Sequence, residues 1–412
     1  MKISKKAINS YWIVAILVMM ERTFYLFNNS DRILITSYAV MWYILFISYM
    51  AYQIIIHKSI TKNSYMYFKS DILGLSLMVF VAAFQCNLLT GQPIGQGLMP
   101  QRNYVTALLS YFVIRKMYDR EYLKPEKVEK GLIVVGIISV FIYCLQIILF
   151  NKVSFITAAR SSSGTRLYVD SVLCVFIGFW GADRYLRYSK KKYLMLVVLT
   201  FIYEFFVSKG RLETAALMLS IVFGVMLLRK NSVRKFVIYA VIVSLILLFI
   251  NTEWSNRFFE AINYIDSGDL SKNTMGIRIA ARASFGKQLA ASIQTMIFGC
   301  GYPNVDNDVA SAMIGYQQHY GLVDNGIFAF AYVYGGLGIC IFVKWFYKLI
   351  RCAWECYKKL GIYLYLMIVV FNILLLYNIT FWWHKASWTL FMVVLMCDME
   401  HKLFDGGIST CK

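Results

Sequence analysis

Repeated apolar stretches, each long enough to cross the hydrocarbon core of a bilayer, constrain this chain more than any other feature. A membrane-crossing helix needs about 20 mainly apolar residues. The twelve candidate segments are 7–27, 33–56, 71–90, 103–118, 131–150, 167–182, 193–208, 212–228, 235–251, 322–343, 361–380 and 386–398. Hydrophobic residues make up 59% and charged residues 16% of the 412 positions, against roughly half and about a quarter in soluble domains. The sequence therefore predicts an all-α polytopic membrane protein.

The basic residues indicate how such a protein would be oriented. The formal net charge of +20 could suggest a nucleic-acid-binding protein, but most of the 42 lysines and arginines lie at the amino terminus, in the carboxyl tail and in alternate connectors. These connectors are 57–70, 115–130, 182–192, 229–235 and 344–360. By the positive-inside rule this set is cytoplasmic. We therefore expect both termini inside the cell, basic residues that contact lipid headgroups, and no nucleic-acid partner.

One long polar segment divides the chain. We expect transmembrane helices 1–9 in residues 1–251, a large extracytoplasmic loop at 252–321, helices 10–12 in 322–398 and a cytoplasmic tail at 399–412. The loop carries five cations, six carboxylates and one histidine. It is the longest segment between apolar stretches, and it is large enough to shape a polar substrate site.

The loop itself contains short predicted elements. Apolar residues at near-helical spacing from Met275 to Met296 predict an amphipathic helix at the outer interface. The turn sequence from Phe298 to Pro303 follows, and Asp308 to Tyr320 could form a second short helix. Asp306-Asn307-Asp308 has the D-x-D spacing of some metal-dependent glycosyltransferases, but an outer face has no supply of nucleotide sugars. We favour a solvated turn or a helix cap there.

The nine cysteines do not suggest a disulfide framework or a metal site. Most of them fall in or at the ends of the predicted spans, and no CxxC pair is present. A structural zinc ion is therefore improbable from the sequence, and we expect no cofactor.

Arginines on the predicted outer side are candidate ligands of phosphate groups. They are Arg160, Arg166, Arg211, Arg278 and Arg282. Any one of them could simply anchor lipid headgroups. Arg211 fits that reading less well, because it follows a connector of only a few residues and has Glu204 and Glu213 close in sequence. A guanidinium offers a rigid fork to phosphate oxygens, so several of them at one membrane face suit a lipid-linked diphosphate.

His319 and Asp324 are the candidates for proton transfer. His319 is the only histidine in the long loop, and Asp324 lies five residues further on. A neutral histidine near pH 7 is suited to accept a proton from a sugar hydroxyl, and Asp324 could orient its ring. His384, in the last predicted outer turn, is a rival that we interpret as part of an aromatic belt.

Three motifs resemble those of a known family. The stretch from Asp324-Asn325 to Gly335-Gly-Leu-Gly338 is similar to the His-Asn-x-x-Leu…Gly-x-x-Gly signature of O-antigen ligases and Wzy-type polysaccharide polymerases. Ser208-Lys-Gly-Arg211 resembles their Ser-Arg-x-x-Leu entry to a span. Arg278 followed by Phe298-Gly-Cys-Gly301 resembles their Arg…Leu-Gly-x-Gly pattern. Asp324 occupies the position of the family's histidine, so either His319 or Asp324 could be the base, and we favour His319.

The resemblance implies an activity. Members of this family transfer a glycan from an undecaprenyl-diphosphate-linked donor to a sugar hydroxyl, without a metal, on the outer face of the bacterial plasma (inner) membrane. We expect a polymerase of oligosaccharide repeat units for a capsule, O-antigen or exopolysaccharide, which could work with a flippase and a chain-length regulator. The five arginines would bind the diphosphate. The alternatives are a ligase with the same donor and a flippase or transporter of lipid-linked oligosaccharide, although no internal repeat supports a transporter.

Overall fold

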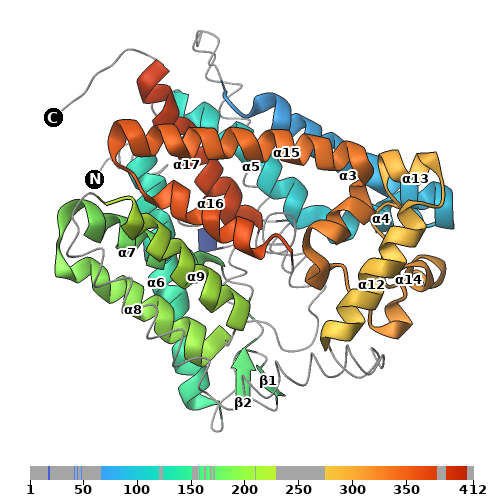
Figure 1. Cartoon of the computed structure of the whole chain (residues 1–412), viewed down its shortest axis with the longest axis horizontal. Helices are drawn as coiled ribbons and strands as arrows, with labels where there is room; N and C mark the ends of the chain where they lie inside the picture. The colour runs from blue at the N-terminus through green and yellow to red at the C-terminus, as the bar shows by residue number, and fades with distance from the viewer. Residues whose placement is uncertain are drawn as a thin grey trace.

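A computed structural model describes residues 66–119, 124–150, 172–208, 210–228, 274–377 and 387–405, together with a short hairpin and a few isolated positions before residue 170. The described part is predominantly helical, as the sequence predicted (Figure 1). The predicted spans 7–27, 33–56 and 235–251 lie outside the described residues, apart from a few single positions, and so does His384.

The long helices follow the apolar stretches of the sequence. They are α3 (Lys69–Thr90), α5 (Arg102–Asp119), α6 (Pro125–Leu149), α7 (Val172–Tyr188), α8 (Leu194–Ile202), α9 (Arg211–Met226), α15 (Gly326–Leu360), α16 (Leu364–Leu375) and α17 (Ser387–Asp405). A π-helical segment at Tyr203–Ser208 continues α8. The short elements of the polar regions are α4 (Ile94–Leu98), α12 (Thr274–Leu289), α13 (Ile293–Phe298) and α14 (Asp308–Ile314).

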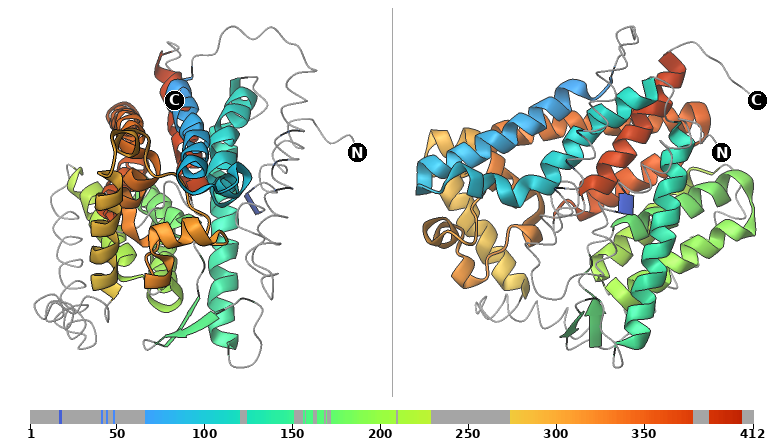
Figure 2. Two further views of the ribbon diagram at one scale, coloured as in Figure 1. Left: turned by 90° about the vertical axis from the view of Figure 1, so that its right-hand side faces the viewer. Right: turned by 180° about the vertical axis from the view of Figure 1, so that it is seen from behind.

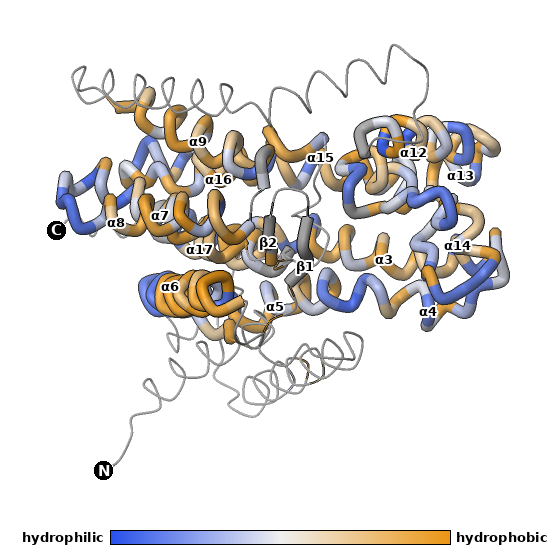
Figure 3. The backbone as a smooth tube through the Cα atoms, turned by 90° about the horizontal axis from the view of Figure 1, so that it is seen from below, coloured by the Kyte–Doolittle hydropathy of each residue, from blue (hydrophilic) through white to orange (hydrophobic). Residues whose placement is uncertain are grey.

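Three of these helices are long and apolar enough to cross a membrane, namely α3, α6 and α15, and Leu212–Met226 and Leu364–Leu375 are shorter apolar helices. The outward face of α3 carries a stripe of exposed large apolar side chains: Leu73, Leu77, Phe80, Phe84 and Leu88. Such a stripe is costly in water and is suited to contact with lipid. Figure 3 shows hydrophobic residues along α6 and α16, and more hydrophilic residues around α4, α13 and α14.

The helices pack in neighbouring pairs: α3 with α15, α5 with α17, α7 with α8, and α9 with α16. The hairpin lies at the opposite side of the molecule from the carboxyl-terminal end of α17 (Figures 1 and 2). Its strands, β1 (Ala158–Ser161) and β2 (Gly164–Leu167), are antiparallel. The sequence had predicted no strand in the described ranges, so this short hairpin is an addition to a fold that is otherwise helical, as expected.

Several predicted boundaries differ from the observed ones. The span expected at 167–182 is helix α7 from Val172 to Tyr188, because the strand β2 uses the residues up to Leu167. The span expected at 322–343 and the connector expected at 344–360 are joined in α15, whose helical backbone is interrupted at Gly335. In the carboxyl-terminal part of α15, Lys348 pairs with the buried Asp71 of α3, and its Nζ lies 2.6 Å from Asp71 Oδ2.

Buried charges between the helices have close partners. The Arg115 guanidinium is fully buried, and its Nε donates to Asp398 Oδ2 at 2.9 Å. Tyr111 donates its hydroxyl hydrogen to the same oxygen at 2.5 Å, and Arg115 also pairs with Asp119 one helical turn further on. An ionic group in such surroundings is stable only with partners of this kind. The Arg115–Asp398 group therefore joins α5 to α17.

A glycine-rich segment passes between α3 and α15 and breaks the helical backbone of α15. At Gly335 the backbone has φ 64° and ψ −168°. Cys300 and Gly301 donate their backbone N–H groups to the carbonyls of Tyr332 and Val333, at 2.6 and 3.2 Å. A Cβ atom on Gly335 would lie 2.3 Å from the nitrogen of Gly299. The glycines of the two family-like motifs therefore have a structural role, because they allow this close backbone contact.

Candidate anion-binding site at the start of helix α15

Two arginines of α12 face the residues that open α15. Arg278 and Arg282 are four residues apart, which places them on one face of a helix. Arg278 Nη2 lies 3.4 Å from Asp324 Oδ1, and Arg282 Nε donates to Asn325 Oδ1 at 3.2 Å. The structure thus brings together two predicted phosphate ligands and one predicted proton acceptor. They lie within 46 residues of sequence, on two elements that the sequence analysis treated separately.

Arg282 is held by several groups at once. Its Nη2 donates to the backbone carbonyl of Tyr377 at 3.2 Å, and its guanidinium carbon lies 4.0 Å from the centre of the Tyr377 ring and 5.2 Å from that of Phe328. Burial lowers the pKa of Arg282 below its ordinary value, Tyr377 opposes this change and Arg278 adds to it. These contacts orient the guanidinium and fix the end of α16 against α12.

The Arg278 side chain has fewer contacts than that of Arg282. Its side chain is 31% exposed and that of Asp324 is 56% exposed, so their ion pair is partly solvated. Its Nε is buried and has no hydrogen-bond partner among the described residues. An unpartnered buried N–H group carries a free-energy cost that an anionic ligand can relieve. Arg278 is therefore the member of the pair with donors to spare.

Asn325 and Gly326 fix the position of this site. Asn325 is buried, and its Nδ2 donates to the carbonyl of Gly321 at 2.7 Å. Gly326 has φ 50°, and a Cβ atom there would lie 2.3 Å from the carbonyl oxygen of Leu376. The N–H of Ile327 donates to that same carbonyl at 2.9 Å. The Asp-Asn-Gly sequence therefore locks the start of α15 to the end of α16.

His319 lies apart from this cluster. It follows a short 3₁₀ turn, Tyr316–Gln318, in the left-handed conformation with φ 62°, and it is exposed. No hydrogen bond or ion pair joins it to Asp324, although the structure describes both residues. The expected orientation of the His319 ring by Asp324 is thus not present, and Asp324 pairs with Arg278 instead.

The other three predicted arginines belong to α9 and to the hairpin. Helices α9 and α16 pack together with Gly224 against Met367. The start of α9, at Arg211, therefore lies near the end of α16, where Tyr377 is found. Arg160 and Arg166 belong to the hairpin, where they stand opposite Thr165 and Ala159 in the strand register. The hairpin packs against the π-helical segment that precedes α9.

The expected amphipathic helix at Met275–Met296 is two helices. Helix α12 ends at Leu289 and α13 begins at Ile293, because Ser292 and Thr295 form a capping box. The second short helix is confirmed as α14, which Gly315 ends in the left-handed conformation. Asn307 caps α14 by accepting a hydrogen bond from the N–H of Ala310, at 3.0 Å. The interpretation of Asp306-Asn307-Asp308 as a helix cap is thus confirmed.

Sequence reasoning missed Tyr377 and Phe328, the two aromatic rings around Arg282. No local signal marks Tyr377, which lies 95 residues from Arg282 and reaches it only through the packing of α16. Phe328 stands in the Asp324–Gly338 motif, where it could have been proposed from its position one turn after Asn325.

The comparisons with protein-family models and with curated proteins gave no match for this chain.

Proposed function

We propose that this protein transfers a glycan from an undecaprenyl-diphosphate-linked donor to a sugar hydroxyl at the outer face of the bacterial plasma membrane. One observation carries the proposal. The guanidinium groups of Arg278 and Arg282 lie next to Asp324 and Asn325, at the entry to a helix that could cross a membrane. The motif resemblance to Wzy-type polymerases and O-antigen ligases supports the same activity.

In this proposal the diphosphate replaces Asp324 as the partner of Arg278. The pair is long at 3.4 Å and partly solvated, so the diphosphate competes with a single, weakly held carboxylate. Fixed guanidinium groups then neutralise the charge that develops on the leaving diphosphate. Arg282 keeps its orientation through Asn325 and Tyr377. We propose Arg211, Arg160 and Arg166 as further ligands of the diphosphate on the basis of the sequence alone. Because the guanidinium groups supply the positive charge, this step needs no metal ion.

The displaced carboxylate supplies the base. Asp324, released from Arg278, accepts the proton of the acceptor hydroxyl as that oxygen attacks the anomeric carbon. Attack from the side opposite the departing diphosphate inverts the anomeric centre. The geometry favours Asp324 over His319 for this role, because Asp324 already pairs with Arg278 whereas no hydrogen bond or ion pair joins His319 to this cluster among the described residues.

We place the protein among polymerases, in which both donor and acceptor are lipid-linked repeat units. In this topology both termini are cytoplasmic, the segment 252–321 is extracytoplasmic, and a flippase supplies the substrate. A chain-length regulator could act on the product. A ligase would use the same donor and the same arginines with a different acceptor.

The test is an assay with the full-length protein in detergent, an undecaprenyl-diphosphate-linked repeat unit as the only substrate, and EDTA. A ladder of lengthened glycans that the Arg278→Ala variant does not make supports the polymerase. Transfer that occurs only once a separate lipid acceptor is added assigns a ligase. Substrate that crosses the bilayer of reconstituted vesicles without being lengthened would replace the proposal by a flippase.

A further inference from the structure

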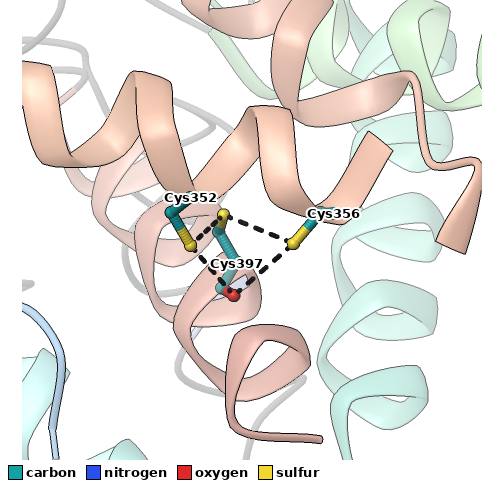
Figure 4. A group of neighbouring side chains, drawn as sticks. All are labelled: Cys352, Cys356 and Cys397. Atoms are coloured by element: carbon teal, nitrogen blue, oxygen red, sulfur yellow. Dashed lines mark hydrogen bonds between the residues drawn. The ribbon is translucent and has the colours of Figure 1, made fainter. Parts of the chain in front are cut away.

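Three buried cysteines meet where α15 packs against α17 (Figure 4). Cys352 and Cys356 lie on α15, and Cys397 lies on α17. The Sγ atoms of Cys397 and Cys352 are 2.9 Å apart, those of Cys397 and Cys356 are 3.9 Å apart, and all three lie within 4.8 Å of one another. All three residues are fully buried. None of them has a role in the proposed glycosyl transfer.

The sequence spacing gives each helix a pair of metal-binding residue types. Cys352 and Cys356 are four residues apart on α15, and Cys397 and His401 are four residues apart on α17. Residues at this spacing share one face of a helix. Three cysteines and one histidine, in two pairs with three intervening residues each, form the donor set of a closed structural zinc site.

His401 has the second contact that a zinc-binding histidine needs. It is 6% exposed, its ring stacks on Tyr67 with centroids 4.7 Å apart, and its Nε2 lies 2.8 Å from Glu355 Oε2. Glu355 stands on α15 between Cys352 and Cys356. A histidine that binds a metal through one ring nitrogen almost always donates from the other to a carboxylate or carbonyl. The His401 ring nitrogens do not belong to the group of ligand atoms that all lie within 4.8 Å of one another, so the His401 side chain has to shift toward the three sulfurs to complete the site.

The sulfur positions suit a tetrahedral ion after a small adjustment. Zn–S bonds of about 2.3 Å separate two sulfurs by about 3.8 Å in a tetrahedron. The Cys356–Cys397 distance of 3.9 Å matches this value, and the Cys352–Cys397 distance of 2.9 Å would have to open. That change requires a different side-chain torsion at Cys352 or Cys397. The thiols otherwise have only weak contacts of 3.5 and 4.0 Å to the Cys397 carbonyl.

We propose that Cys352, Cys356, Cys397 and His401 bind one Zn²⁺ ion that fastens α17 to the carboxyl-terminal half of α15. The site lies toward the predicted cytoplasmic end, where thiols stay reduced and available to a metal. The proposal departs from the sequence-based expectation that zinc is improbable, which rested on the absence of a CxxC pair. On a helix, the spacing of four that Cys352 and Cys356 have places both thiols on one face.

The experiment measures metal in the full-length protein, purified in detergent with an affinity tag that contains no histidine. Mass spectrometry of the metal content should find about one zinc ion per chain in the wild-type protein. The matched control is Cys340→Ser, because Cys340 is on α15 but exposed. We expect that variant to retain its zinc, and Cys352→Ser and Cys397→Ser to fall to background.

A measurement on the wild-type protein covers the case in which the cysteine variants fail to fold. An organomercurial that reacts with thiols should release about one zinc ion per chain to a zinc-sensitive dye. The proposal is overturned if the wild-type protein holds no zinc and takes none up when reduced, or if Cys352→Ser and Cys397→Ser hold as much zinc as Cys340→Ser does. A disulfide between Cys352 and Cys397 in the purified protein would also overturn it.

Discussion

Two arginines of this molecule, Arg115 and Arg278, differ in how completely they are partnered. Arg115, between α5 and α17, is fully buried and binds both Asp398 and Asp119. Arg278, on α12, is partly exposed, has one long ion pair with Asp324, and leaves a buried N–H without a partner among the described residues. Removing one partner of a fully paired buried charge is strongly destabilising, whereas a charge at a surface with an unpaired donor has capacity left for a ligand. We therefore use the number of partners of each arginine to distinguish a structural cation, Arg115, from a candidate functional one, Arg278.

The largest expected effect is a loss of stability when the fully paired Arg115 is replaced. Arg115→Met leaves the Asp398 carboxylate buried with the Tyr111 hydroxyl and the backbone N–H of Tyr67, which should destabilise the protein by about 3–5 kcal/mol. Thermal unfolding in detergent and the yield of folded protein measure the loss. The control is Arg351→Met, whose partner Glu355 is also on α15 and whose side chain is 63% exposed. A variant Arg115→Met as stable as Arg351→Met would show that partner number does not mark structural charges.

The next largest expected effect is a loss of glycan transfer when the partly paired Arg278 is replaced. Arg278→Ala should lower glycan transfer on the order of 1000-fold, because it removes a guanidinium that stabilises the departing diphosphate. Its unfolding temperature should stay close to that of the wild-type protein, since the ion pair it removes is partly solvated. The control is Lys287→Ala, which removes an exposed cation at the other end of α12. Equal activity of the two variants would remove Arg278 from the site.

The smallest expected effect distinguishes Asp324 from His319 as the base. Asp324→Asn should lower transfer on the order of 100-fold through loss of the proton acceptor, and His319→Ala should change it by less than about tenfold, because His319 lies apart from the arginines. Both variants are compared at saturating donor, so that weaker binding is not mistaken for slower chemistry. The opposite order would restore His319 as the base, and an Asp324→Asn protein with full activity would exclude the carboxylate.

The sequence predicted the parts of this structure that depend on local patterns. Apolar stretches located α3, α5, α6, α9 and α16 to within a few residues, except at the amino-terminal end of α6 and the carboxyl-terminal end of α16. The turn residues after Met296 and the cap at Asn307 were also read correctly. Each of these signals lies within about ten residues of the feature that it predicts.

The contacts that define the two candidate sites could not be predicted in this way. The Arg278–Asp324 pair joins α12 to α15, and the Arg282–Tyr377 contact depends on where α16 ends. Residue types suggested Arg278 and Asp324 separately, but only packing shows that they share one site and that His319 does not. The cysteine group likewise depends on the register of α15 against α17, which no spacing within either helix determines.

The most direct test of the central claim is whether the partly partnered arginines bind diphosphate. Native mass spectrometry of the detergent-purified protein would compare retention of undecaprenyl diphosphate with that of undecaprenol, in the wild-type, Arg278→Ala and Lys287→Ala proteins. We expect the wild-type and Lys287→Ala proteins to prefer the diphosphate lipid, and Arg278→Ala to lose at least about tenfold of that preference, as one charge-assisted contact predicts. Equal preference in all three proteins would contradict the account.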